Sequence, residues 1–175
     1  GAGGGIALTV GTLAGSGTIS ANGGMGNGTG LLGSGGGGGG RIAIEHGANL
    51  FFGTITCRGG NGSAVGGAGT IYTKGPAQSW GHVLVDNGGQ AGTNTTLGTS
   101  SPGTVDLTVQ GGAVLVPISA QTIGTLLVAS NGWLCITNYA YELTVTGNAT
   151  IQAGGGILAN GTGYPGYMGP GAGKF

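Results

Sequence analysis

The chain has 175 residues, 48 of them glycine, and its four basic residues balance four acidic ones in a charged fraction of only 5 %. This neutrality argues against nucleic acid or anionic lipid as a partner, because both are bound through clustered Lys and Arg. Clustered rather than periodic glycines exclude a collagen triple helix, and the 38 % of hydrophobic residues argues against disorder.

Five segments of alternating β-type residues predict short strands along the chain, each with one apolar face. They occupy residues 6–10, 41–45, 70–74, 105–109 and 143–146. A second predicted strand follows each of them, at residues 17–23, 53–59, 82–88, 125–132 and 156–161. The units recur about every 35 residues, which indicates a repeat architecture.

Asn-Gly pairs recur after these strands, for example at Asn87 and Asn131. The pair accepts left-handed backbone angles and fits a corner between strands, but it also closes hairpins, so a sandwich or barrel stays open. We predict an all-β, single-domain fold over residues 1–175, a parallel β-helix (β-solenoid) of about five Gly-rich coils without significant helix. The expected core is Ile6, Leu8, Val10, Ile42, Ile44, Ile71, Leu107, Val109, Leu143 and Val145.

The glycine run Gly35–Gly40 leads directly into the strand that begins at Arg41. A flexible hinge between domains is the usual interpretation of such a run. We favour a link between two coils of one fold, in which glycine lets one backbone approach another closely. A packed layer resembling polyglycine II is the third alternative.

Six stretches in chain order resemble the glycine-rich β-helical repeats of very large secreted and cell-surface proteins of bacteria. The similarity covers most of the chain and is weakest over residues 90–138. It implies an extracellular, adhesin-like or structural module, and it implies no catalytic residues. The stretches are LAGSGTISANGG, GGGGGGRIAI, GAGTIYTK, VLVDNGG, LTVTGNATI and ILANGTGYPG.

Residues with catalytic or metal-binding chemistry are few and scattered. The carboxylates occur about one per predicted coil, whereas a polysaccharide-cleaving β-helix would need several together. They are Glu45, Asp86, Asp106 and Glu142. His46 and His82 have no acid or cysteine at a useful spacing and are expected to be solvated or at corners. Cys57 and Cys135 are expected to be buried free thiols, and a disulfide between them stays open. We therefore expect no enzyme, no metal and no cofactor.

Four aromatic side chains are the candidate ligand contacts, because flat rings on a neutral surface can stack against the apolar face of a sugar. They are Trp80, Trp133, Tyr139 and Tyr141. The alternative that these rings close the core or a coil interface stays open. Recurring Thr-x-Thr also raises ice binding, but the spacing is too irregular for a flat threonine array.

The sequence thus predicts a non-enzymatic, extracellular or cell-surface β-solenoid that serves as a structural or adhesive unit of a fibre. Low charge and Gly-rich ends without a capping helix suggest a homo-oligomer or filament formed end to end. A carbohydrate- or receptor-binding module is the alternative, with surface glycans as partners. No apolar run reaches the roughly 18 residues of a membrane span, and we expect the chain to be a piece of a longer repeat protein.

Overall fold

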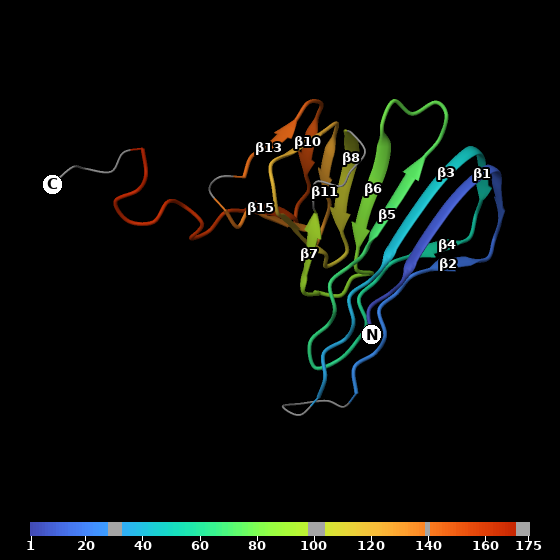
Figure 1. Ribbon diagram of the computed structural model, residues 1–175, viewed down its shortest axis with the longest axis horizontal. Coiled ribbons are helices and arrows are strands. Elements are labelled where there is room, and N and C mark those ends of the chain that lie inside the picture. Colours follow the sequence, from blue (N-terminus) through green and yellow to red (C-terminus); the bar gives the residue numbers. More distant parts are fainter. Residues whose placement is uncertain (28–32, 98–103, 139–140, 171–175) are drawn as a thin grey trace.

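The computed structural model describes residues 1–27, 33–97, 104–138 and 141–170 (Figure 1). Every regular element in these ranges is a strand, which confirms the predicted all-β class, and they contain no helix that could cross a membrane. The strands are β1 (Gly5–Gly15), β2 (Thr18–Ser20), β3 (Arg41–Phe51), β4 (Thr54–Thr56), β5 (Thr70–Lys74), β6 (Gly81–Asp86), β7 (Asn94–Leu97), β8 (Val105–Gln110), β9 (Val114–Pro117), β10 (Gln121–Ile123), β11 (Leu126–Val128), β12 (Trp133–Cys135), β13 (Leu143–Val145), β14 (Ala149–Ile151) and β15 (Gly156–Leu158).

A seven-stranded sheet runs through the molecule in the order β1-β3-β5-β6-β8-β11-β14 (Figure 1). Its neighbours are parallel except for the antiparallel pair β5 and β6. The sheet therefore consists of two parallel halves. The N-terminal half contains β1, β3 and β5, and the C-terminal half contains β6, β8, β11 and β14.

Each half has further strands that pack on the large sheet. In the N-terminal half β2 and β4 form a parallel pair in which Ile19 lies opposite Ile55. In the C-terminal half β7, β9, β12 and β15 form a four-stranded parallel sheet, and β10 pairs with β13. Thus the polypeptide returns several times to the same layer with its strands in parallel register.

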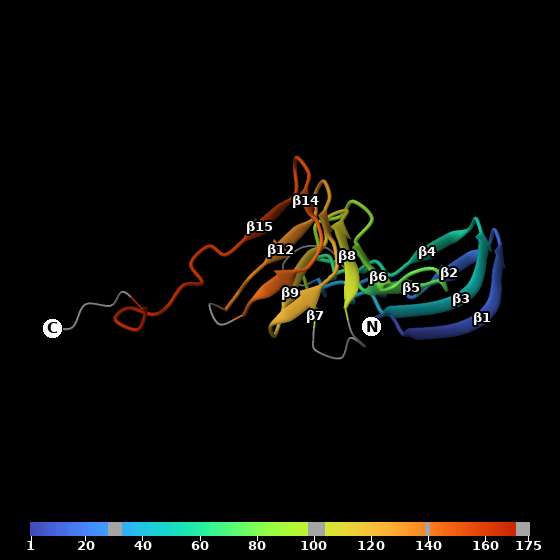
Figure 2. The same ribbon diagram turned by 90° about the horizontal axis from the view of Figure 1, so that it is seen from above.

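The two halves bury opposite faces of the large sheet. At the antiparallel junction Ile71 lies opposite Leu84 and Tyr72 lies opposite Val83, and residues directly opposite share a face. Ile71 and Leu84 pack in the N-terminal core, whereas Val83 and Tyr72 pack in the C-terminal core. Consequently the face that is internal in the N-terminal half becomes the outer face of the C-terminal half (Figure 2).

The predicted repeat of about 35 residues is wrong in the C-terminal half. Gly81 pairs with Val105 and Leu126 with Ala149, so these partners lie only 24 and 23 residues apart. Two predicted second strands belong to the large sheet, because residues 82–88 overlap β6 and residues 125–132 include β11. Conversely, the predicted first strand at residues 143–146 includes β13, which belongs to a two-stranded sheet. Alternation of apolar residues identifies a strand but not the sheet that it joins.

Half of the predicted core residues are buried, and the prediction misses most of the C-terminal core. Five of its members are buried, namely Ile42, Ile44, Ile71, Leu107 and Val109. The others are only partly buried and are Ile6, Leu8, Val10, Leu143 and Val145. The larger C-terminal core contains unpredicted residues such as Val85, Leu115 and Leu134, all 0 % exposed.

The glycine run is packed against two neighbouring segments and is not a hinge. On one side, the backbone N–H groups of Gly36 and Gly39 donate hydrogen bonds to the segment that follows in the chain, to the carbonyls of Ala64 and Gly67 respectively. On the other side, those of Gly37 and Gly40 donate to the preceding segment, to the carbonyls of Gly24 and Ala21 respectively. Partners on each side therefore recur every three residues, the period of a polyproline II helix. The structure thus supports the polyglycine II-like alternative, in a layer that still links the strands before and after it.

Space around the glycines follows the same period of three. A Cβ on Gly36, Gly37, Gly39 or Gly40 would lie 1.8 to 2.0 Å from a backbone oxygen, whereas on Gly38 the nearest atom is 3.8 Å away. The layer thus requires glycine at the positions that face neighbouring backbones, and it leaves room at every third position.

We expect Gly39→Ala to lower the free energy of unfolding by about 2 kcal/mol or more, because the methyl group meets the backbone of Cys57 and Gly69. The matched control is Gly38→Ala, which should change it by less than about 1 kcal/mol and in the stabilising direction. Chemical denaturation of both variants checks this. Equal losses in the two variants would show that the layer is not packed as described.

Ile44→Asp should destabilise the protein by about 4 kcal/mol or more, because Ile44 is 0 % exposed and a carboxylate there cannot reach water. Ala48→Asp, on an exposed position of the same strand, should cost less than about 1 kcal/mol. Thermal unfolding followed by circular dichroism compares them. Unchanged unfolding of the Ile44 variant would contradict the N-terminal core.

Candidate functional site

The outer face of the C-terminal half gathers polar and aromatic side chains from β6, β8 and the segment before β11. Val83 and Val85 of β6 point into the core, so His82 between Gly81 and Val83 points outward. His82 lies directly opposite Asp106 of β8. Parallel pairing therefore places an imidazole and a carboxylate side by side on this face.

Trp80 joins this pair from the residue before β6. A Cβ on Gly124 would lie 2.3 Å from Cε3 of the Trp80 ring and 2.6 Å from Oδ1 of Asp106. Since β8 lies between β6 and β11, the ring reaches across β8 to the backbone that leads into β11. Trp80 remains 40 % exposed, so part of the indole faces solvent. Glycine at position 124 is what permits this arrangement.

Hydrogen bonds from one residue fix the carboxylate of Asp106. The backbone N–H and the hydroxyl of Thr125 both donate to Oδ1, each at 2.7 Å. Among the described residues no group donates to Oδ2. Asp106 therefore has a fixed orientation and retains acceptor capacity on its second oxygen.

His82 is held by the next outward residue of β8, since its Nε2 lies 2.9 Å from Oγ1 of Thr108. Burial lowers the pKa of His82 below its ordinary value of 6.5, and the negative charge of Asp106 acts in the opposite direction. His82 lies within a strand and is partly buried, so the prediction of a solvated or corner histidine is wrong.

The other predicted ligand contacts lie elsewhere. Trp133 is half-buried in β12, and a Cβ on Gly156 of the adjacent strand would lie 2.8 Å from its ring. Tyr141 is half-buried, and its backbone N–H donates to the carbonyl of Asn138 at 3.1 Å. Tyr139 lies outside the described residues. The pairings place Trp80 beside the large sheet and Trp133 in the four-stranded sheet, so they do not form one platform.

The remaining carboxylates are separated from this face or held by neighbouring polar groups. Asp86 accepts from the backbone N–H of Gly88 at 2.7 Å and from Gln110 at 3.0 Å. Glu45 lies opposite Lys74 in the N-terminal half, and Glu142 accepts from Thr144 at 3.4 Å. In the described ranges no three His, Cys, Asp or Glu side chains group into a metal site.

Both cysteines, Cys57 and Cys135, are free thiols, as predicted, but only Cys57 is fully buried. Burial raises the pKa of the Cys57 thiol to about 11, so it is a poor nucleophile at neutral pH. Neither thiol lies in the cluster on the outer face.

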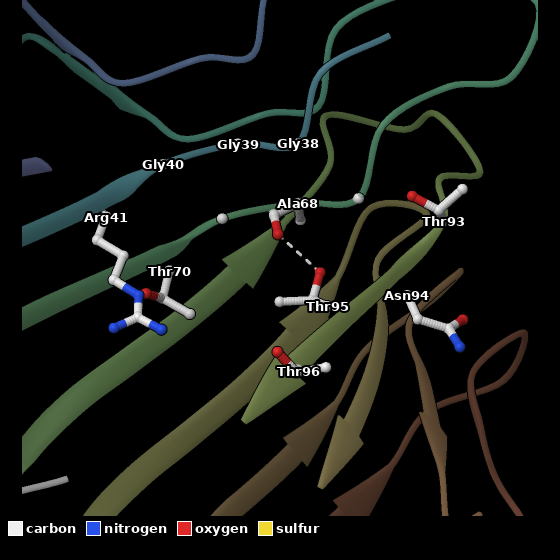
Figure 3. Close-up of a pocket in the computed structure, with 12 residues that line it drawn as sticks. Gly38, Gly39, Gly40, Arg41, Ala68, Thr70, Thr93, Asn94, Thr95 and Thr96 are labelled. Carbon is white, nitrogen blue, oxygen red and sulfur yellow. Dashed lines mark hydrogen bonds between the residues drawn. The ribbon is translucent and has the colours of Figure 1, made fainter. Parts of the chain in front are cut away.

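A hollow of about 230 Å³ lies between the glycine layer and β7, away from the outer face (Figure 3). Arg41 lies beside Thr70 there, and Thr95 donates to the carbonyl of Ala68 at 2.7 Å across the gap. Glycine backbone, threonine side chains and Asn94 line the remainder. With Arg41 as its one charged lining residue, this hollow offers no acid–base pair.

Comparisons with protein-family models, with curated proteins and with solved structures give no match for this chain. The site on the outer face therefore rests on its own geometry.

Sequence reasoning identified Trp80 but did not associate it with His82, Asp106 or Thr125. The alternation of apolar and polar residues in 81–86 and 105–110 places His82 and Asp106 on the polar side of two similar strands. This alternation does not show that the two strands, β6 and β8, are direct neighbours in the sheet.

The lowered pKa of His82 predicts a pH-dependent stability. Between the folded and unfolded pKa values the unfolded chain binds more protons, so this contribution is present above about pH 6.5 and is lost on acidification. His82→Gln should remove it and flatten the decline of unfolding free energy between about pH 7.5 and 5.5, by at most about 1.4 kcal/mol per pH unit. Denaturant titrations across this range test it. Identical slopes in both proteins would contradict the assigned burial.

Proposed function

We propose that the chain is a non-enzymatic structural or adhesive unit of an extracellular or cell-surface fibre, built as a single-domain β-solenoid that associates end to end. The observation that carries this proposal is the exposure of apolar side chains in β14 and β15, the last strands of two sheets in the C-terminal half. Low charge and the resemblance to glycine-rich repeats of bacterial surface proteins support the extracellular setting.

In-register columns of side chains support the solenoid description. Each column passes from strand to parallel strand on the inner side of a sheet, as successive coils of a solenoid require. One column consists of Val85, Val109, Val128 and Ile151. Another consists of Leu115, Leu134 and Ile157. The pairing of β5 with β6 divides the solenoid into two stacks.

In both columns the last side chain, which belongs to β14 or β15, is exposed to solvent. Val85, Val109 and Val128 are 0 % exposed, but Ile151 of β14 is 47 % exposed. Leu134 is 0 % exposed, whereas Ile157 of β15 is 44 % exposed. The loss of burial occurs because, among the residues that the structure describes, no further strand pairs with the outer edge of β14 or β15. We call the surface formed by β13, β14 and β15 the open end.

The open end has the chemistry that another copy of this chain needs for docking. An edge strand presents backbone N–H and C=O groups that pair with a further strand about 4.8 Å away. Covering the exposed apolar side chains adds about 25 cal/mol for each Å² removed from water. Because the formal net charge is zero, copies do not repel one another over long range.

The other functional classes have less support. The dispersed carboxylates give no paired acid and base for an enzyme acting on polysaccharide. Thr-x-Thr recurs too irregularly along the sequence for the regular array that ice binding needs. Carbohydrate recognition through Trp80 would use a surface distinct from the open end.

Light scattering over a concentration series tests the end-to-end association. The average mass should rise with concentration, and Ile157→Lys should raise the concentration needed at least tenfold by placing a charge in the contact. Met25→Lys, at a 77 % exposed position in the N-terminal half, is the matched control and should associate as the parent chain does. A parent chain that stays monomeric throughout would overturn the proposal.

A further inference from the structure

We propose that the outer face of the C-terminal half binds a neutral carbohydrate through Trp80, Asp106 and His82. This site goes beyond the structural function proposed above and does not depend on association of the chain. It is carried by the juxtaposition of a partly exposed indole, a fixed carboxylate with a free oxygen and an imidazole on one sheet face.

The indole supplies the apolar part of such a site. Trp80 lies across β8 against the backbone at Gly124, and 40 % of the residue is exposed. An aromatic ring held against backbone offers its open part at low entropic cost, because the side chain is already ordered. The C–H face of a pyranose is the kind of surface that packs on such a ring.

The polar part provides acceptors and donors at fixed positions. Thr125 holds Oδ1 of Asp106 by two hydrogen bonds, and this orients Oδ2 for a ligand hydroxyl. Nε2 of His82 lies 2.9 Å from Oγ1 of Thr108, so the second ring nitrogen, Nδ1, is the one that His82 offers to a ligand. Few, well-placed polar groups around an aromatic surface are the usual composition of a small-molecule site.

Charge and shape define the class of sugar. Asp106 is the charged residue in the cluster, and His82 is favoured in its neutral form, so a uronic or sulfated sugar would meet a negative site with no cation to pair. In the outward row next to it Thr108 and Leu127 lie in register, whereas Leu84 of the same row packs in the N-terminal core. One exposed ring, with Thr108 and Leu127 on the strands beside it, suits a neutral oligosaccharide.

The two tryptophans of the chain allow a direct test. In Trp133→Phe the only indole is Trp80, and its fluorescence is titrated with neutral tetrasaccharides of glucose, mannose, galactose and xylose. The titrations use the background Ile157→Lys, so that they report binding whether or not the chain self-associates. We expect a saturable fluorescence change with at least one of these sugars.

Three variants assign the binding to this face. Calorimetry with the same sugar should show at least tenfold weaker binding for Trp80→Ala and for Asp106→Ala, while Trp133→Phe binds as the parent does. Asp106→Asn, which can still accept from Thr125, should also bind more weakly because it loses the charge-assisted hydrogen bond to the sugar. Circular dichroism confirms that each variant is folded.

Three results would overturn the site. One is the absence of saturable binding to every neutral sugar tested. Another is equal affinity in the parent and the folded Trp80→Ala variant. The third is binding that occurs only with sulfated or uronic oligosaccharides, because the charge of Asp106 disfavours them.

Discussion

Parallel, in-register pairing of backbones across the seven-stranded sheet is the constraint on which the rest of the structure depends. Register decides which side chains lie above one another, and a shift by one residue would turn every apolar side chain to the opposite face. Ile42 and Ile44 are buried for this reason, and so are Val85, Val109 and Val128. The same register brings His82 beside Asp106 on the outer face.

The antiparallel pair of β5 and β6 gives the molecule two different sides. Since the core changes face at this pair, each half leaves free the side that the other half buries. His82 and Asp106 therefore lie outside the C-terminal core, although Leu84 on the same face of β6 packs in the N-terminal core. A binding surface and a stacking end can thus exist in one small protein without competing for residues.

The all-β class and several of the strands could be predicted from the sequence. Alternating residues located β1, β3, β5 and β8, and the packing of Gly35–Gly40 was among the alternatives considered. The face switch at β5 and β6 was not predictable, because Tyr72 and Leu84 are both apolar and either could face the core. For the site, Trp80 was predicted from its chemistry, but Asp106 became its neighbour only through strand order, which depends on long-range pairing.

We propose that the open end formed by β13, β14 and β15 adds further copies of the chain. This association is tested by electron microscopy of the purified protein at increasing concentration. Stacking at the open end should give filaments whose strands lie across the axis with a layer spacing of about 4.8 Å. Monodisperse single particles at every concentration would contradict it.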